Sequence, residues 1–594
     1  MVHPFFTKIM RLSAEWVFAL TKQKKQNFVY GSTVLMASMI IVKLIGAVFK
    51  IPLTNILGLT GLGYFTRAYT VYTTIYALTV TGLSAAVARM VAENLERKRY
   101  RDVRKIFRLA TLLFLILGVL GAGLIFFSAK GFSEMIKSPN SYWAIVMLAP
   151  AIFFCCMMAS YRGYYEGLSN MTPTAVTQVV EVVAKLVAGL GFALIVMQIA
   201  EKQFQETGKV FGMAAESLEA AQMIAVPYGA AGAMLGVSVS TLVGLVYIYF
   251  RHKLKGDSIT KEMLRNAPPS RRSKVLVYRL LKVALPVTLG AVVLQLSALI
   301  DSTTIQNRLD YCYSASPETL NSLYGSFLKE NEGMSDFLFG IFSSCVTLFN
   351  LVPAFTNIFG KSALPNVTAA WTERDRARIK LNVESVIRVT MLVAAPMSMG
   401  MAFMAEPILK LLYSKQEGIE SGAVLLAILA VASLFLALVT PMNAIIQGVG
   451  RMDLPVKYLF CGALTKLVLN VVLIGIPSIN ILGSSVSTLA CYLLIAFLSI
   501  NKLRKIVTVS LNYTGIFIKP LIAGLACGIM ALLSYNLLQA IGPSRLITIL
   551  SIGIGGLCYL LVLFVLKGIA REDVLMLPKG NKIAKTLEKL HIIR

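Results

Sequence analysis

Charged residues inside long apolar stretches carry the main functional signal of this chain, because such a charge is costly unless a partner or a wet cavity stabilises it. Lys43 and Lys50 lie seven positions apart in the first stretch, which puts both ammonium groups on one face of a helix. Arg67 stands at the start of the second stretch, and Arg308 follows the seventh. Cations dominate this set, so it favours binding of an anionic head group such as a pyrophosphate.

Other charged residues are candidates for coupling, charge pairing or gating. Asp301 is expected either to neutralise a lysine on a neighbouring helix or to take part in coupling. Glu181 and Lys185 are spaced i, i+4 and are expected to form a local ion pair. Lys466 takes the place of Lys185 in the second half of an internal repeat, but Gly462 replaces the acid, so Lys466 needs another partner. Three residues at expected cytoplasmic helix ends are candidates for a gate or for structural contacts: Arg89, Arg162 and Glu166.

The head-group candidates also have a structural interpretation. Lys50 and Arg67 lie close enough to the ends of their stretches for their side chains to reach the membrane–water interface. Lys43 lies deeper in its stretch, so a functional role is favoured for it.

The elements that must position these residues are membrane-spanning helices. Hydrophobic residues make up 57% of the chain and charged residues only 14%, a composition that a soluble surface cannot cover. Apolar stretches of about 20 residues, enough for a helix to cross roughly 30 Å of hydrocarbon, predict an all-α polytopic membrane protein with about 14 transmembrane helices. They are expected near residues 32–57, 64–92, 106–127, 142–165, 173–200, 226–250, 278–302, 335–358, 380–404, 421–447, 455–476, 479–501, 515–539 and 545–568.

An internal repeat divides these helices into two sets. The run from Gly236 to Leu242 recurs as the run from Gly483 to Leu489, and the first half carries an insertion near residues 201–226. The small residues of these runs are expected to be packing faces. Two copies of one unit predict a two-lobed membrane transporter with a substrate site at the seam of the lobes. The predicted domains are a cytoplasmic N-terminal segment (1–27), an N-lobe (28–254), a basic cytoplasmic linker (255–276), a C-lobe (277–505), two C-terminal helices (506–568) and a basic cytoplasmic tail (569–594).

Basic residues gather on alternate links between the predicted helices. Lys and Arg outnumber Asp and Glu by 57 to 29, and they cluster at residues 97–105, at residues 251–274 and near both termini. This asymmetry predicts cytoplasmic termini and an even number of spans. The basic excess is therefore attributed to topology and to contact with anionic lipids, not to nucleic acid.

No catalytic residue, metal site or cofactor is expected. The three His (His3, His252 and His591) all fall on the expected cytoplasmic side, and Cys312 alone among the eight Cys falls in an expected external loop. The chain also lacks a Walker-type phosphate-binding loop, which argues against ATP hydrolysis. The sequence therefore predicts a transporter and not an enzyme.

The residues around the first charged pair resemble a known family. The segment from Lys43 to Leu53, followed by Leu57 to Tyr64, resembles the first-helix signature of the polysaccharide-transport branch of the MOP exporter superfamily. The segments Tyr165 to Pro173 and Asp301 to Leu309 fit the same pattern. The resemblance is greatest to the Gram-positive branch that holds the lipid II flippase and stage V sporulation protein B.

The resemblance implies a flippase in a bacterial plasma membrane, built from two pseudo-symmetric six-helix lobes and two C-terminal helices. Such proteins move polyprenyl-pyrophosphate-linked sugars from the inner to the outer leaflet by alternating access, and lipid II for peptidoglycan synthesis is the favoured substrate here. Cell-wall synthases are the implied protein partners. Two lobes suffice for a transporter that works as a monomer. Energy coupling is expected to depend on membrane potential instead of a sodium site. The implied head-group site comprises Lys43, Lys50, Arg67 and Arg308, with Asp301 in support.

Three alternatives remain open. The first alternative is a flippase for another lipid-linked polysaccharide. A cation-coupled multidrug exporter would share the fold, but it would need more deep acids than Asp301 and Glu181. A polyprenyl-dependent glycosyltransferase would need a catalytic carboxylate in a large external loop, and only residues 303–334 are long enough.

Overall fold

A computed structural model describes residues 28–568 of the chain, except residues 331, 452, 508–511 and 541–544. The predicted terminal segments, 1–27 and 569–594, lie outside the described residues. Thirteen helical stretches in the described part are long and apolar enough to cross a membrane. The first of them, Ile41–Glu96, contains two of the predicted spans, so the all-α polytopic fold with about fourteen spans is confirmed.

The first two spans form a hairpin that turns at a glycine. Helix α2 (Phe28–Tyr76) is continuous except at Gly58, whose φ of 75° lies in the left-handed region that glycine adopts without strain. Phe49 and Phe65 would be roughly 24 Å apart in a straight helix, yet their ring centroids are 5.7 Å apart. The chain therefore folds back on itself at Gly58.

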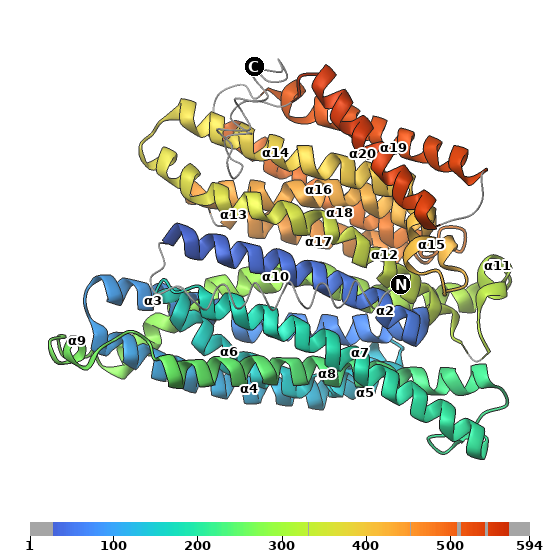
Figure 1. Ribbon diagram of the computed structural model, residues 1–594, viewed down its shortest axis with the longest axis horizontal. Helices are drawn as coiled ribbons and strands as arrows, with labels where there is room; N and C mark the ends of the chain where they lie inside the picture. The colour runs from blue at the N-terminus through green and yellow to red at the C-terminus, as the bar shows by residue number, and fades with distance from the viewer. Residues whose placement is uncertain (1–27, 331, 452, 508–511, 541–544, 569–594) are drawn as a thin grey trace. The chain divides into compact units, whose positions relative to one another are not determined.

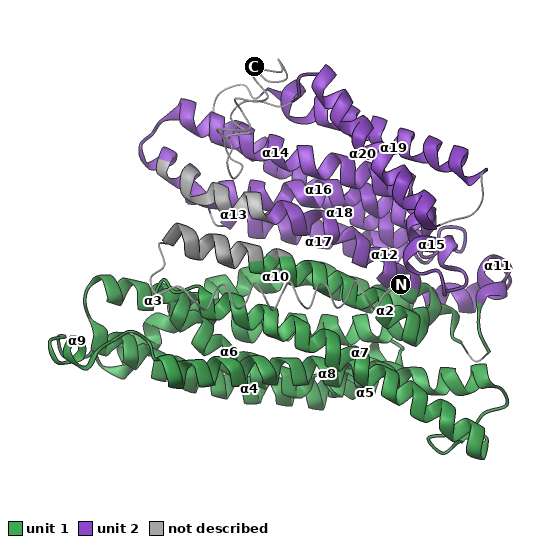
Figure 2. Cartoon of the chain, in the orientation of Figure 1, with its two compact units in different colours: residues 1–307, 328–340 green, residues 308–327, 341–594 purple. Residues whose placement is uncertain are grey.

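The chain divides into two compact units, which Figure 2 colours separately. Unit 1 comprises residues 1–307 and 328–340, and unit 2 comprises residues 308–327 and 341–594. This division cuts two helices, α10 (Ser273–Ala315) and α12 (Met334–Phe349), and it differs from the predicted lobe boundary at residues 255–276. The predicted lobe limits stay a prediction.

Unit 1 is built from long helices around a buried core that includes Phe49, Leu53, Phe65, Tyr164 and Met234. Helix α6 contacts both α4 and α8, and α7 contacts both α2 and α8 (Figure 1). Besides α2 and the first part of α10, its elements are η1 (Ala77–Thr81), α3 (Gly82–Glu96), α4 (Tyr100–Met135), η2 (Pro139–Ser141), α5 (Tyr142–Val146), α6 (Ala149–Gly167), α7 (Thr172–Thr207), β1 (Lys209–Val210), β2 (Met213–Ala214), α8 (Leu218–Lys255) and α9 (Lys261–Arg265).

Unit 2 is also built from long apolar helices. Helix α16 contacts α13, α14 and α18, and the C-terminal pair α19 and α20 pack on each other, with α19 also lying on α14. Its elements, besides the ends of α10 and α12, are α11 (Pro317–Tyr324), η3 (Gly325–Phe327), α13 (Leu351–Thr372), α14 (Arg376–Phe403), α15 (Ala405–Leu412), η4 (Ile419–Gly422), α16 (Ala423–Gly448), α17 (Asp453–Leu473), α18 (Leu482–Val507), η5 (Thr514–Ile518), α19 (Lys519–Gln539) and α20 (Arg545–Val565).

The repeated glycines mark close helix packing in both units. A Cβ on Gly236 of α8 would lie 2.3 Å from the Cα of Gly189 on α7. A Cβ on Gly483 of α18 would lie 2.8 Å from the backbone nitrogen of Ile474, just after α17. The insertion predicted near residues 201–226 contains the β1–β2 hairpin, which joins the extended ends of α7 and α8.

Candidate functional site

Lys43 and Lys50 lie on the first arm of the α2 hairpin, whose helix is uninterrupted between them. Their spacing therefore places them on the same side of the arm, as expected. Lys43 is exposed and Lys50 is half-buried. The Lys50 ammonium is close enough to Lys185 on α7 for the two charges to interact.

Lys185 lies over an aromatic surface formed by both arms of the hairpin. Its Nζ atom is 4.3 Å from the ring centroid of Tyr69, 5.2 Å from that of Phe49 and 5.7 Å from that of Phe65. These distances are within the range of cation–π attraction, which stabilises the ammonium by about 0.5–2 kcal/mol per favourable contact. The aromatic face continues along α2 through Tyr72, whose ring centroid is 5.6 Å from that of Tyr69.

Glu181 pairs with Arg162, which corrects the expected ion pair between Glu181 and Lys185. The Arg162 guanidinium on α6 donates to Glu181 Oε2 at 2.9 Å and to Thr177 Oγ1 at 3.0 Å. Two donors in one planar guanidinium thus satisfy both acceptors on α7. Lys185 forms no ion pair with any residue that the structure describes. Glu181 is close enough to Lys185 for their charges to interact, but its direct ion pair is with Arg162.

Arg67 is fully buried in a polar network of unit 1. Its guanidinium donates to Asp336 Oδ1 at 2.7 Å, to Ser138 Oγ at 2.9 Å and to Gln306 Oε1. Tyr64 adds a hydrogen bond to Asp336 Oδ2 at 3.0 Å. The network connects α2, the residue before η2, α10 and the first turn of α12. The charge of Arg67 is thus compensated inside the protein.

Arg308 and Lys466 lie in unit 2. The Arg308 guanidinium lies 4.6 Å from the ring centroid of Tyr311, and a Cβ on Gly475 would come within 2.3 Å of its Nη2 atom. Lys466 is 2% exposed on α17. Asn470, one turn further along α17, accepts a hydrogen bond from Ser487 on α18. Both residues of α17 are buried inside unit 2.

The remaining candidates are spread over unit 1. Asp301 on α10 is half-buried, Glu166 near the end of α6 is half-buried, and Arg89 on α3 is exposed. The structure thus brings together Lys50, Lys185, Glu181 and Arg162, with Lys43 on the same arm of the α2 hairpin as Lys50. It holds Arg67 in a network of its own. The binding, coupling and gating roles of all these residues stay predictions.

Sequence reasoning missed two features of the site. Asp336 stands in the first turn of an apolar helix, where acidic residues are common. Nothing in the local sequence therefore marks it as the partner of Arg67. The aromatic face on α2 did carry a signal, since Phe65, Tyr69, Tyr72 and Tyr76 follow the spacing of one helix face.

Metal binding finds no support in the described part of the chain, where no group of three or more His, Cys, Asp or Glu is placed to hold an ion.

Comparisons with known proteins match two parts of the chain to family models and the greater part of it to curated relatives. The family model described as Polysaccharide biosynthesis protein matches residues 28–311, and the MatE model matches residues 335–472. The lipid II flippase MurJ of Bacillus subtilis (strain 168) is 23% identical over 486 residues, which cover 80% of this chain and 82% of that protein. Stage V sporulation protein B of the same organism is 21% identical over 561 residues, which cover 93% of this chain and 98% of that protein.

Solved structures share the fold. The inward closed conformation of the lipid II flippase MurJ aligns with a TM-score of 0.58 at 12% identity, covering 91% of this chain and 98% of that one. An inward-facing multidrug resistance MATE family transporter of the MOP superfamily also gives a TM-score of 0.58, at 14% identity, covering 83% of this chain and 98% of that one. The likeness extends over nearly the whole of each solved chain.

Proposed function

We propose that this multi-pass membrane protein moves a polyprenyl-pyrophosphate-linked sugar across the bilayer by alternating access. The confirmed resemblance to the polysaccharide-transport branch of the MOP exporter superfamily supports this proposal. Lipid II is the proposed substrate, because the lipid II flippase MurJ is similar in both sequence and fold. The proposed direction is from the inner to the outer leaflet of a bacterial plasma membrane, with both termini in the cytoplasm.

The observation that carries the proposal is the net positive charge around Lys185. Lys50, Lys185 and Arg162 stand against Glu181, and Glu181 is already paired with Arg162. An aromatic surface attracts the Lys185 ammonium without cancelling its charge, so the ammonium keeps its attraction for an anion. A diphosphate bound there would gain charge-assisted hydrogen bonds.

The net positive charge around Lys185 also distinguishes the proposed flippase from a multidrug exporter. The likeness to a MATE transporter shows the shared fold alone. A site for cationic drugs needs carboxylates free to bind them, whereas the carboxylate of Glu181 accepts from Arg162 at 2.9 Å. The described residues around Lys185 therefore favour an anionic substrate.

In the proposed mechanism, the polyprenyl tail stays in the lipid while the head group crosses between the helices, because a sugar diphosphate is too polar to enter hydrocarbon. Lys50 and Lys185 bind the diphosphate, with Lys43 on the same arm of the α2 hairpin. An inside-negative potential favours outward movement of the anion by about 2.3 kcal/mol per charge per 100 mV. Transport needs no cofactor in this proposal, and cell-wall synthases would use the product.

Binding of undecaprenyl diphosphate to the purified chain tests the head-group assignment. Lys50→Gln and Lys185→Gln should each weaken binding roughly tenfold or more, because each removes a charged donor to the diphosphate. The matched control is Lys202→Gln, since Lys202 is 75% exposed and paired with Glu206 outside the site. Unchanged affinity in both site variants would refute the assignment, and preferential binding of a cationic dye would favour drug export.

A further inference from the structure

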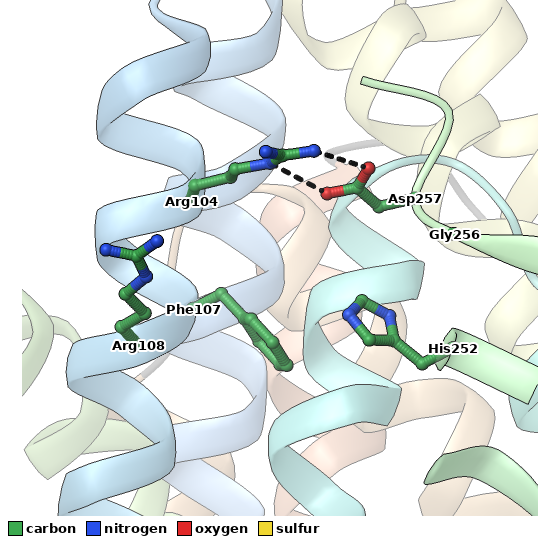
Figure 3. Close-up of a pocket in the computed structure, with 6 residues that line it drawn as sticks. All are labelled: Arg104, Phe107, Arg108, His252, Gly256 and Asp257. Carbon is green, nitrogen blue, oxygen red and sulfur yellow. Dashed lines mark hydrogen bonds and ion pairs between the residues drawn. The ribbon is translucent and has the colours of Figure 1, made fainter. Parts of the chain in front are cut away.

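A second cationic site lies at the basic end of unit 1, away from Lys185. A pocket of about 290 Å³ is lined by residues of α4, the end of α8 and the loop that follows it (Figure 3). This volume is near the lower end of ordinary small-ligand pockets, which start at roughly 300 Å³. The lining residues are Arg104, Phe107, Arg108, His252, Gly256 and Asp257.

The only acid of the pocket lining is already neutralised. Figure 3 shows the Arg104 guanidinium pointing at Asp257, to which it donates two hydrogen bonds of 3.2 Å. Tyr164 donates a third to Asp257 at 2.8 Å. Arg104 and Asp257 therefore cancel each other, and Arg108 supplies the net charge of the pocket.

Arg108 differs from its basic neighbours, which are occupied in holding the loop before α10. Arg101 donates to the backbone oxygens of Leu264 and Arg265, and Lys105 donates to that of Arg271 at 2.7 Å. Arg108 is exposed, and it makes no hydrogen bond, ion pair or ring contact with the residues that the structure describes. Its guanidinium is thus available to a ligand.

Aromatic rings make the floor of the pocket rigid. The ring centroid of Phe107 is 4.4 Å from that of Tyr164, 5.2 Å from that of Tyr161 and 5.3 Å from that of His252. Tyr165 fixes His252 through a hydrogen bond of 2.9 Å to its Nδ1 atom. This part of the pocket lining is therefore preformed, which lowers the entropy cost of binding.

The position of Arg108 along α4 matches the head-group region of a bilayer. Helix α4 has 36 residues, so it is about 54 Å long and, when centred on a hydrocarbon core of roughly 30 Å, extends about 12 Å beyond each side. Arg108 is eight positions after Tyr100, at the inner edge of that extension. Leu112, Leu115 and Val119 follow on the same helix face, and they are 54%, 39% and 57% exposed.

We propose that this pocket binds the phosphate of an anionic phospholipid, with Arg108 as the anchor and the exposed stripe of α4 as the path of an acyl chain. An unpaired arginine at the end of an apolar stripe matches a ligand with an anionic head and an apolar tail. A guanidinium suits this phosphate because it offers paired donors. The site is distinct from the proposed transport site, and it does not depend on which glycan is moved.

The test is retention of short-chain lipids on the full chain, measured by native mass spectrometry. Dioctanoyl phosphatidylglycerol should bind the unchanged protein, whereas dioctanoyl phosphatidylcholine and inorganic phosphate should not. Arg108→Gln should lower phosphatidylglycerol occupancy roughly tenfold or more, since it removes the charged donor. Arg108→Lys should retain part of the binding.

Arg265→Gln is the matched control, because Arg265 is exposed on the neighbouring α9 and does not line the pocket. This variant should bind phosphatidylglycerol like the unchanged protein. Equal phosphatidylglycerol retention by the Arg108→Gln protein would overturn the proposal. Retention of inorganic phosphate at the same level would show a soluble-anion site and would overturn the lipid assignment.

Discussion

At the scale of single residues, the cations of this chain fall into two physical classes. Arg67 is buried with its charge compensated by Asp336 at 2.7 Å. Lys185 is held over aromatic rings and forms no ion pair with a described residue. The first arrangement stabilises the fold, and the second is suited to bind an anion. Residue type and depth alone do not separate the two classes.

Asp336→Asn should therefore destabilise the protein. It leaves the Arg67 charge buried without its counterion, which costs about 3 kcal/mol for a buried ion pair. Thermal unfolding in detergent measures this loss. Arg67→Gln combined with Asp336→Asn should recover part of the lost stability, and the control Glu206→Gln, at a carboxylate that is 62% exposed, should leave Tm unchanged. An unchanged Tm for the Asp336→Asn protein would contradict the structural role of the network.

Residue partners were only partly predictable. The i, i+4 rule pointed to Lys185 as the partner of Glu181, because local spacing was the only geometry that the sequence contained. The actual partner of Glu181 is Arg162, which is on another helix. The partner of Arg67 is Asp336, which is also on another helix and far away along the chain. Tertiary packing decides whether a charged residue pairs with a local or a distant partner. No short pattern in a single sequence shows this packing.

At the scale of elements, close helix packing depends on glycines at particular crossings. Gly236→Ala should destabilise the protein by about 1–3 kcal/mol, the usual cost of overpacking, because its Cβ would meet the Gly189 backbone at 2.3 Å. The matched control is Gly191→Ala on α7, where nothing lies within 4 Å of the added Cβ. A Tm of the Gly236→Ala protein equal to that of the control would show that α7 and α8 are not closely packed there.

The loop after α8 is fixed by Asp257. Burial opposes ionisation of this carboxyl, but hydrogen bonds from Arg104, from Tyr164 and from the backbone N–H of Ile259 lower the pKa of Asp257 below its ordinary value of 3.8. A lowered pKa in the folded state stabilises the protein above the ordinary value, and this contribution is lost as pH falls through the lowered pKa.

Asp257→Asn should thus cost about 1–2 kcal/mol at neutral pH, since Arg104 is partly exposed and its hydrogen bonds are weakened by water. The difference in Tm from the unchanged protein should be constant above about pH 5 and should shrink below pH 3.8. Asp453→Asn is the control, because its ion pair with Lys457 is exposed. A Tm difference that persists at the lowest pH would contradict this account.

Helix positions were the most predictable part of the fold, since an apolar stretch of about 20 residues has few alternatives to a membrane span. The hairpin at Gly58 was visible as a break between the predicted spans 32–57 and 64–92, although only the structure shows that the turn falls at a glycine with positive φ. The division of α10 between two compact units was not predictable either, because it depends on which helices the two parts of α10 contact.

At the scale of the whole molecule, the central claim is that a membrane protein with the fold of the MOP superfamily moves an anionic lipid-linked sugar. Unit 1 supplies Lys50 and Lys185 in the proposed site. An inside-negative potential acts on the diphosphate in the outward direction, so transport and its dependence on potential should be lost together when these lysines are neutralised.

Translocation of lipid II in proteoliposomes that hold the purified protein tests this claim most directly. We expect transfer that accelerates under an inside-negative potential, persists in the Lys202→Gln protein and is lost when Lys50→Gln and Lys185→Gln are combined. Folded protein that transfers no lipid II, or equal transfer by the double variant, would contradict the account.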